Sequence, residues 1–295
     1  MSYPDKITKT IKEFRYFSPK TVSEVVSILA KDAEAVVLAG GTDVVPMMKQ
    51  REIAPESVVN IKNIPKLAYI REDREGLKIG ALTTISMLVE SDIIKQKYLA
   101  LYEAAAGFGT WEVRNMATIG GNICQSLPSG DTFPPLLAFG AEVKLVGLKG
   151  ERRVPIEKFC TGPGTNVLDR ELLVEVILPK QNGKYGSAYD KKKRSSVDLA
   201  KASCAVNVTV RDGKCEDIKV AMGALADKLV RARTVEEALK GKALSDEVIE
   251  AAAQKVTNDI SPRTSVRSTA WYRTEVSKVL VRRMIKLAAE RCSKV

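Results

Sequence analysis

The sequence contains no histidine among its 295 residues. This absence excludes Ser-His-Asp and Cys-His nucleophilic machinery and removes the commonest protein ligand of transition metals. Cysteine is scarce as well, because the five cysteines include no C-x-x-C pair and no spacing typical of a metal site or a disulfide framework. We therefore expect buried free thiols, no metal ligand, and an iron–sulfur cluster nowhere in this chain. Any catalysis must depend on a cofactor.

Aromatic residues make up only 5% of the chain, and no apolar run approaches the ~20 residues that span a bilayer. A shortage of aromatics disfavours binding to single-stranded nucleic acid, which needs stacking platforms. Residues 1–6 contain no apolar segment typical of a signal peptide. These absences predict a cytoplasmic protein that binds neither membrane nor nucleic acid.

The formal net charge is +11, but the basic residues are mixed with 36 acidic ones. The densest basic run, residues 191–194, is short. It is interpreted first as a solvated surface, next as a contact for an acidic protein partner, and only last as a nucleic-acid contact.

Two glycine pairs stand out against this background. Gly40-Gly41 follows the apolar segment 35–38, and Gly120-Gly121 is followed within ten residues by Ser129 and Asp131. Adjacent glycines tolerate positive φ and let backbone N–H groups approach a ligand closely. We expect two loops of inward-facing amides, which suit phosphate groups.

The residues around these glycines indicate a ligand with a diphosphate and hydroxyl-bearing sugars. Asp131 suits a ribose or ribityl hydroxyl, and the alternative is an N-cap for the following helix. No G-x-G-x-x-G follows a strand, and no G-x-x-x-x-G-K-[ST] occurs. Rossmann and P-loop nucleotide binding are therefore disfavoured.

Apolar periodicity predicts two α+β domains joined by a polar linker at 181–184. Before the linker, helices are expected over 21–31, 44–49, 85–89, 99–106 and 132–139, and strands over 35–38, 57–61, 77–80, 141–146, 152–154 and 172–178. After it, strands are expected over 201–210 and 217–222, and helices over 234–239, 245–256 and 271–289.

The order of the motifs resembles one known family. The residues that carry the resemblance are Gly40-Gly41 with Pro46 and Lys49, segments 79–84, 113–122, 159–164 and 171–179, then Arg194, Asp198, 261–263, Arg267, Tyr272 and Arg273. They resemble the FAD-binding medium subunit of molybdenum hydroxylases, the family that includes the medium subunits of bacterial xanthine, carbon monoxide and nicotinate dehydrogenases. The resemblance extends over nearly the whole chain.

The resemblance implies an α+β fold with an FAD-binding domain of the vanillyl-alcohol-oxidase (PCMH) type over 1–180, in subdomains of about 1–55 and 56–180. A C-terminal α+β domain over 181–295 follows. It implies an oxidoreductase subunit with non-covalent FAD, while molybdopterin and 2Fe–2S clusters belong to a large and a small partner subunit. Electrons pass from the clusters through FAD to a soluble acceptor such as NAD. The alternative is a standalone FAD-dependent oxidoreductase of the same fold.

The resemblance also implies which residues bind the flavin nucleotide. Backbone amides of 38–44 hold the diphosphate, residues of 117–125 complete that clamp, and Asp131 binds a hydroxyl. Phe108 and Leu173 pack near the isoalloxazine ring or the adenine. The expected set is Leu38, Ala39, Gly40, Gly41, Thr42, Asp43, Val44, Phe108, Ala117, Thr118, Gly121, Asn122, Gln125, Asp131, Leu173, Asp190 and Lys191. No catalytic side chain is expected.

One position departs from the family pattern. Members that reduce NAD commonly carry a lysine four residues before the position of Arg194, and here that residue is Asp190, with Lys191 next to it. Either the chain slips by one residue and Lys191 substitutes, or the electron acceptor differs from NAD.

Overall fold

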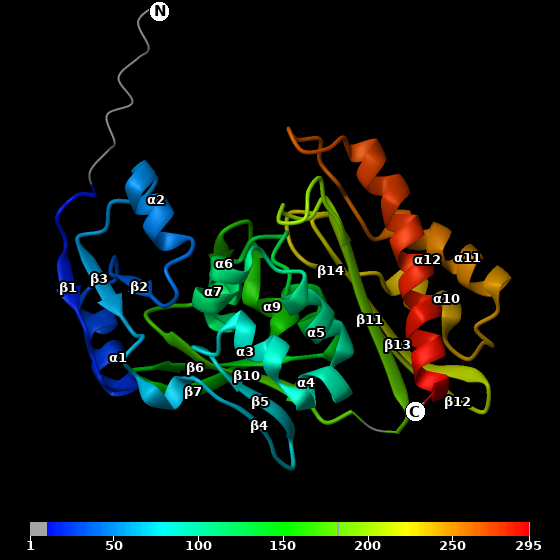
Figure 1. The fold of residues 1–295 in the computed structure, drawn as a ribbon, viewed down its shortest axis with the longest axis horizontal. Helices are drawn as coiled ribbons and strands as arrows, with labels where there is room; N and C mark the ends of the chain where they lie inside the picture. Colours follow the sequence, from blue (N-terminus) through cyan, green and yellow to red (C-terminus); the bar gives the residue numbers. More distant parts are fainter. Residues whose placement is uncertain (1–10, 182, 295) are drawn as a thin grey trace, which may run out of the picture.

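The computed structural model describes residues 11–181 and 183–294. Residues 1–6, on which the prediction about a signal peptide depends, lie outside these ranges. The described chain forms a row of three sheets, with a small N-terminal sheet at one end, a five-stranded sheet in the centre and a four-stranded sheet at the other end (Figure 1).

The N-terminal sheet is parallel and has the order β1-β3-β2. Its elements are β1 (Arg15–Phe17), α1 (Val22–Lys31), β2 (Val36–Leu38), α2 (Val44–Gln50) and β3 (Ser57–Asn60). Helix α1 begins where the Thr21 hydroxyl accepts a hydrogen bond from the Glu24 N–H. It buries Val25 and Leu29 in a core with Val59. The first glycine pair, Gly40-Gly41, lies in the loop that follows β2.

The central sheet is antiparallel, with the order β4-β5-β10-β6-β7. Its strands are β4 (Ile70–Glu72), β5 (Gly76–Gly80), β6 (Glu142–Gly147), β7 (Gly150–Pro155) and β10 (Leu172–Pro179). Helices pack on one face and share its apolar core: α3 (Ile85–Glu90), α4 (Asp92–Lys97), α5 (Leu99–Ala106), α6 (Trp111–Met116), α7 (Ile119–Gln125), α8 (Phe133–Phe139) and α9 (Ile156–Phe159). A 3-10 turn (Pro65–Leu67) precedes β4, and a hairpin of β8 (Cys160–Gly162) and β9 (Thr165–Asn166) precedes β10.

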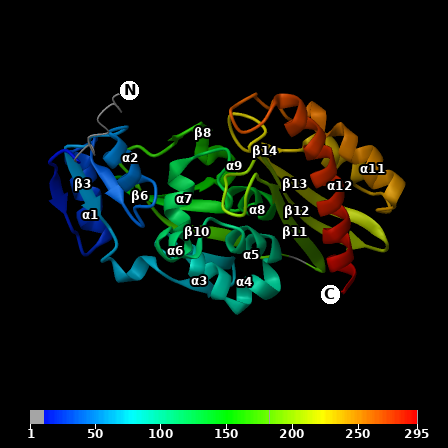
Figure 2. The same ribbon diagram turned by 45° about the horizontal axis from the view of Figure 1, so that its top comes forward.

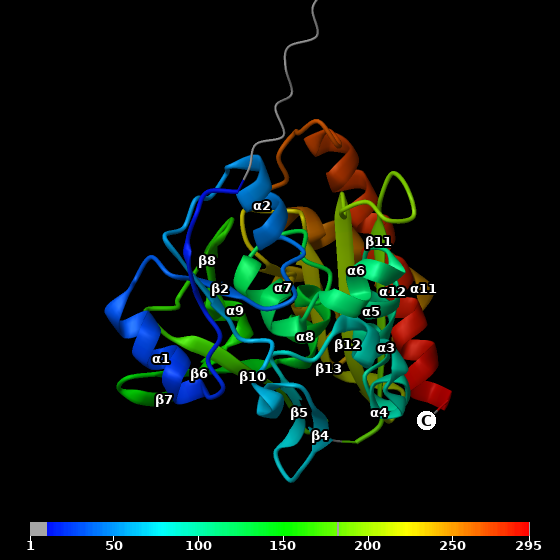
Figure 3. The same ribbon diagram turned by 60° about the vertical axis from the view of Figure 1, so that its left-hand side comes forward.

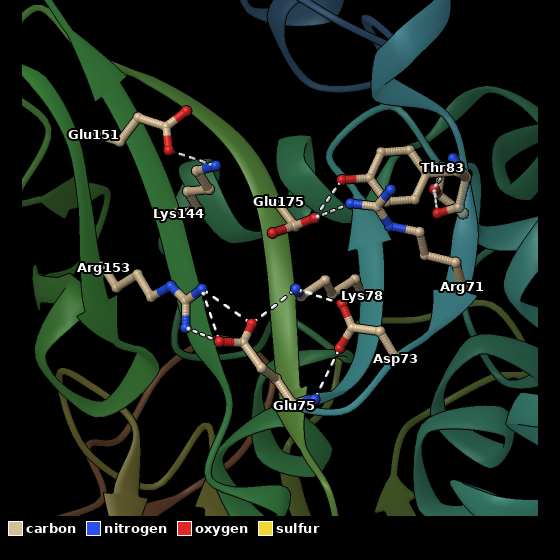
Figure 4. Close-up of polar contacts among 10 residues, drawn as sticks. Arg71, Asp73, Glu75, Lys78, Thr83, Lys144, Glu151, Arg153 and Glu175 are labelled. Carbon is tan, nitrogen blue, oxygen red and sulfur yellow. Dashed lines mark hydrogen bonds and ion pairs between the residues drawn. The ribbon is translucent and has the colours of Figure 1, made fainter.

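The opposite face of the central sheet carries charged side chains. Successive side chains of a strand point to opposite faces of the sheet. Val176 is buried in the core under the helices, so Glu175 points to the opposite face. Figure 4 shows Glu175 beside Arg71, and Glu75 between Lys78 and Arg153.

The C-terminal sheet is antiparallel and has the order β11-β12-β13-β14. Its elements are β11 (Tyr185–Lys192), β12 (Ala202–Arg211), β13 (Lys214–Gly223), β14 (Val230–Arg231), α10 (Arg233–Leu239), α11 (Asp246–Gln254), a 3-10 turn (Lys255–Asn258) and α12 (Ala270–Lys294). Helices α10 to α12 cover the outer face, while α5 and α8 contact the inner face (Figure 2). Burial on both faces leaves the first seven residues of β12 buried, including the polar Ser203 and Asn207.

Most predicted elements occur within two residues of their expected ends. The exceptions are β13, which begins three residues before the expected strand over 217–222, and α12, which continues five residues beyond the expected helix over 271–289. The sequence indicates no strand over 185–192, where β11 forms. The polar residues of β11 give no apolar pattern that would predict a strand. The strand is buried because it pairs with β12 and packs against α5 and α12. Within 11–181 and 183–294, no helix is long and apolar enough to cross a bilayer. The five cysteines are free thiols, of which Cys124 is half-buried and the others buried.

Candidate functional site

A partly open cavity of about 370 Å³ lies where the N-terminal sheet meets the helices of the central sheet. The loop between β2 and α2 forms one wall, the segment around α7 forms the second, and residues 170–173 at the start of β10 form the third. Figure 3 shows α2 and its preceding loop beside α7. The side chains of Gln125 and Met47 join the two walls, with 3.7 Å between Nε2 and Sδ.

The first glycine pair forms the loop that its sequence predicts. Gly41 has a φ of 75°, a conformation that L side chains rarely adopt. Among the residues that the structure describes, the N–H groups of 40–43 donate to no other protein group. Successive amides around a left-handed residue form an anion-binding concavity, so this wall fits a diphosphate.

The two glycine motifs touch each other at Gly40. A Cβ atom on Gly40 would lie 1.9 Å from the carbonyl oxygen of Met116, which no side chain tolerates. The absence of a side chain therefore lets the first loop close against the segment that leads into α7.

The second glycine pair is not the loop that its sequence predicts. Gly120 and Gly121 lie in the first turn of α7, after Thr118 as N-cap. Their N–H groups are already engaged, with Gly120 donating to the Ala81 carbonyl at 3.0 Å and Gly121 to the Thr118 hydroxyl at 3.1 Å. A Cβ on Gly120 would lie 2.7 Å from the Ala81 carbonyl oxygen. This pair therefore permits close packing of α7, and it offers no open row of amides.

The structure brings most of the predicted site residues together. Those that line the cavity are Ala39, Gly40, Gly41, Thr42, Asp43, Val44, Phe108, Ala117, Thr118, Gly121, Asn122, Gln125 and Leu173. Leu38, Asp131, Asp190 and Lys191 do not line it. The Leu38 carbonyl instead accepts a hydrogen bond from Ile61, which holds the loop to β3.

The sequence interpretation omits an apolar end of the cavity and a polar rim. The apolar end consists of Leu29, Ala33, Ala35, Val37 and Ile61, and further lining residues are Ala81, Gly120, Cys124, Asn166, Leu168, Arg170, Glu171 and Leu172. The apolar lining residues have the same spacing along the helix and strands as residues of the hydrophobic core. No local sequence pattern therefore distinguishes a residue that lines the cavity from one that is buried in the core. Arg170 has a φ of 54°. Glycine is the residue that usually indicates such a conformation, so the sequence did not predict this turn.

Asp131 and Lys191 meet in a buried ion pair behind the cavity. Lys191 Nζ lies 2.6 Å from Asp131 Oδ2, and the Tyr189 hydroxyl donates to Asp131 Oδ1 at 3.2 Å. Burial raises the pKa of Asp131, and the charge of Lys191 opposes that rise. A Cβ on Gly107, next to the cavity residue Phe108, would contact the Lys191 side chain at 4.0 Å.

Two sequence interpretations are wrong here. Asp131 does not cap α8, whose N-cap is Thr132, and the Thr132 hydroxyl donates to Asn122 Oδ1 at 2.7 Å instead of capping the helix. Lys191 is buried rather than part of a solvated run, because β11 turns its side chain towards the central helices. The neighbouring Asp190 side chain accepts a hydrogen bond from the Lys191 N–H.

The ionisable groups of the cavity are shifted by burial and by an ion pair. Burial raises the pKa of Asp43 and raises that of Cys124 to about 12, so Cys124 carries no thiolate near neutral pH. Arg152 donates to both carboxylate oxygens of Glu171, at 2.7 and 2.6 Å, and lowers its pKa. The site therefore offers backbone amides, small side chains and apolar contacts.

Comparison with known proteins now decides the family. Residues 12–181 match the FAD binding domain in molybdopterin dehydrogenase, and residues 187–288 match the CO dehydrogenase flavoprotein C-terminal domain. The chain belongs to the FAD-binding medium subunits of molybdenum hydroxylases. The resemblance seen in the sequence and the α+β fold it implies are confirmed, so this is an FAD-binding oxidoreductase subunit.

Individual relatives of this medium subunit agree. The glyceraldehyde dehydrogenase medium chain of Sulfolobus acidocaldarius is 34% identical over 94% of this chain and 99% of its own length. The xanthine dehydrogenase FAD-binding subunit of Escherichia coli O157:H7 is 31% identical over 92% of this chain and 95% of its own length. Among solved structures, carbon monoxide dehydrogenase from Hydrogenophaga pseudoflava superposes with a TM-score of 0.93 at 35% identity, covering 96% of this chain and 99% of the matched chain.

Proposed function

We propose that this medium subunit receives electrons from iron–sulfur clusters of a small partner subunit and passes them, through FAD held in the 370 Å³ cavity, to a soluble acceptor. The observation that carries the proposal is the row of free N–H groups at 40–43 on the cavity wall. Bound FAD supplies the redox chemistry, and the protein supplies binding, orientation and electrostatics. A chain without histidine suits that division of labour.

The cavity supports a specific orientation of the nucleotide. The amides of 40–43 hold the diphosphate, with Thr118, Gly121, Asn122 and Gln125 facing it from the α7 side. The apolar end between α1 and β3 suits one of the two ring systems, and Phe108 and Leu173 contact the other parts of the nucleotide. The buried Asp131–Lys191 pair supports the structure next to Phe108 from outside the cavity. We also propose the division into domains at 1–180 and 181–295.

NAD is the acceptor we propose. The Lys191 side chain lies 4.0 Å from where a Cβ on Gly107 would stand, next to the cavity residue Phe108, which supports the interpretation that the chain slips by one residue and that Lys191 takes the place of the family lysine. The matched relatives are named medium chains and FAD subunits, and we propose that a large molybdopterin subunit and a small iron–sulfur subunit complete the complex here as well.

The test is to coexpress the chain with the small and large subunits expected from its family and to record the absorption spectrum. We expect a flavin band, iron–sulfur absorbance and three chains that purify together. Gly121→Val should abolish flavin retention, because a Cβ there already lies 3.0 Å from Thr118 Oγ1. NADH oxidation with an artificial acceptor tests the choice of NAD. Full turnover by the isolated chain would instead favour the standalone enzyme, and absence of flavin would exclude both.

A further inference from the structure

Two segments of the C-terminal domain place exposed apolar side chains beside each other, outside the flavin site. Residues 193–201 connect β11 to β12, and residues 261–272 lead into α12. Together they expose Val197, Leu199, Val266, Trp271 and Tyr272, with Val266 96% and Trp271 73% exposed. Figures 1 and 3 show both segments at the same end of the molecule. We call this surface the C-terminal platform.

The platform is strongly basic. Its cations are Lys193, Arg194, Lys201, Arg263 and Arg267, and its carboxylate, Asp198, pairs with Arg194 at 2.6 Å. Within the described residues, neither Arg263 nor Arg267 forms an ion pair. Glu275, one turn further along α12, pairs with Lys278. The surface therefore keeps uncompensated positive charge beside its apolar side chains.

Arg273 makes the platform a fixed surface. Its buried guanidinium donates to the carbonyl of Lys201 on one segment and to Ser265 Oγ at 3.1 Å on the other. It also donates to the Ala224 carbonyl at 3.0 Å. A surface that is ordered before binding loses less conformational entropy when a partner docks.

The side chains favour a protein partner over nucleic acid. Trp, Tyr and Arg are the residues most often found at the centres of protein interfaces. One face of the Tyr272 ring is already covered by Lys201, whose Nζ lies 5.3 Å from the ring centroid, so this face does not accept a stacked base. Val266 and Leu199 present aliphatic surface, which phosphate groups do not contact favourably.

We infer that the C-terminal platform docks an acidic protein subunit of the same complex, one that presents an apolar pocket for Trp271 rimmed by carboxylates that pair with Arg263 and Arg267. The inference rests on the proposed function, because it takes the partner from the complex proposed above. It assigns a role to Arg194, Arg263, Arg267 and Tyr272, sequence motifs that lie outside the flavin cavity.

The test compares two charge-reversed double variants in the coexpressed complex. Trp271→Ala/Arg267→Glu alters the platform, and Leu148→Ala/Lys149→Glu makes the same kind of change at the β6–β7 turn, where Leu148 is 72% exposed. Both should keep wild-type flavin content and melting temperature. We expect the platform variant to bind its partner subunit at least tenfold more weakly, about 1.4 kcal/mol, with the wild-type interaction weakening as salt rises, while the control matches wild type.

Equal binding by wild type and both variants would overturn the inference and leave the proposed function intact. Equal loss in both variants would also overturn it, because the contact would not be specific to the platform. A wild-type chain that keeps its flavin but recruits neither subunit would overturn the inference together with the proposed complex. Binding of a 20-nucleotide DNA that the platform variant loses, with subunit binding unchanged, would assign the surface to nucleic acid instead.

Discussion

Lys191 and Asp131 form a buried ion pair, 2.6 Å between Nζ and Oδ2, that joins β11 of the C-terminal sheet to the segment before α8. The two residues are 60 positions apart in the sequence. Each carries its charge with little exposure to solvent, so each depends on the other for electrostatic compensation. The pair connects the C-terminal sheet to the helices of the central sheet, next to the cavity.

Removing Lys191 should therefore be costly. We expect Lys191→Met to lower the free energy of unfolding by about 3–5 kcal/mol, because the Asp131 carboxylate stays buried without its partner. Urea unfolding followed by circular dichroism measures this change. Lys191→Met/Asp131→Asn should recover most of the loss, and Lys192→Met on the same strand should change stability by less than ~0.5 kcal/mol. A single variant as stable as wild type would refute the pairing.

Two glycine substitutions separate steric exclusion from backbone strain. Gly40→Ala should abolish flavin retention and cost about 3 kcal/mol or more, because its Cβ would lie 1.9 Å from the Met116 carbonyl. Gly164 has a φ of 72°, and no atom lies within 4 Å of an added Cβ. Gly164→Ala should therefore lower the free energy of unfolding by about 1–2 kcal/mol through backbone strain alone, and the variant should keep its flavin. Flavin stoichiometry and thermal unfolding of the two purified variants decide the matter. Equal flavin content would contradict the close contact between the glycine motifs.

The ion pair of Arg152 with Glu171 predicts a pH dependence. Arg152 lowers the pKa of Glu171 below its ordinary value of 4.5, so the native state binds this proton less tightly than the unfolded state does. The stabilisation is present above about pH 4.5 and is lost as the pH falls through the folded pKa. Arg152→Gln should cost at most about 1 kcal/mol at pH 7, because the pair is partly exposed. Urea unfolding from pH 3 to 7 should show the difference from wild type shrinking as the pH falls. A difference that grows towards pH 3 would contradict this assignment.

Glu175 on the charged face of the central sheet predicts unequal effects of its two partners. The Tyr69 hydroxyl donates to the buried Glu175 carboxylate at 2.5 Å, whereas Arg71 lies 3.6 Å away and is largely exposed. Tyr69→Phe should cost about 1–3 kcal/mol, because it leaves the carboxylate without its donor, and Arg71→Ala less than ~1 kcal/mol. Burial and Glu175 raise the pKa of Tyr69, so its ultraviolet ionisation step should coincide with alkaline unfolding. A larger loss of stability in Arg71→Ala than in Tyr69→Phe would contradict the assignment of Tyr69 as the main partner of Glu175.

The sequence by itself was sufficient for the family and for most of the elements. Helices α1 and α11 carry apolar residues at helical spacing, and strands β2 and β10 are short apolar runs, so the signal is local. Gly40-Gly41 predicts a loop with positive φ, and the structure has Gly41 in that conformation. The absence of histidine led us to expect a cofactor, and the FAD-binding family confirms that expectation.

The tertiary structure alone decided how distant segments complete the site. Gly120-Gly121 reads as a second loop, yet it forms a helical turn because Ala81 accepts its amide and leaves no space for a side chain. Lys191 belongs to the densest basic run of the sequence, yet β11 buries it against Asp131. Burial and ion pairing depend on which segments contact each other in the folded chain. A local sequence pattern does not predict contacts between residues that are far apart in the chain. The sequence thus determined the glycine loop at 40–43 and the family, and long-range packing determined the walls around that loop.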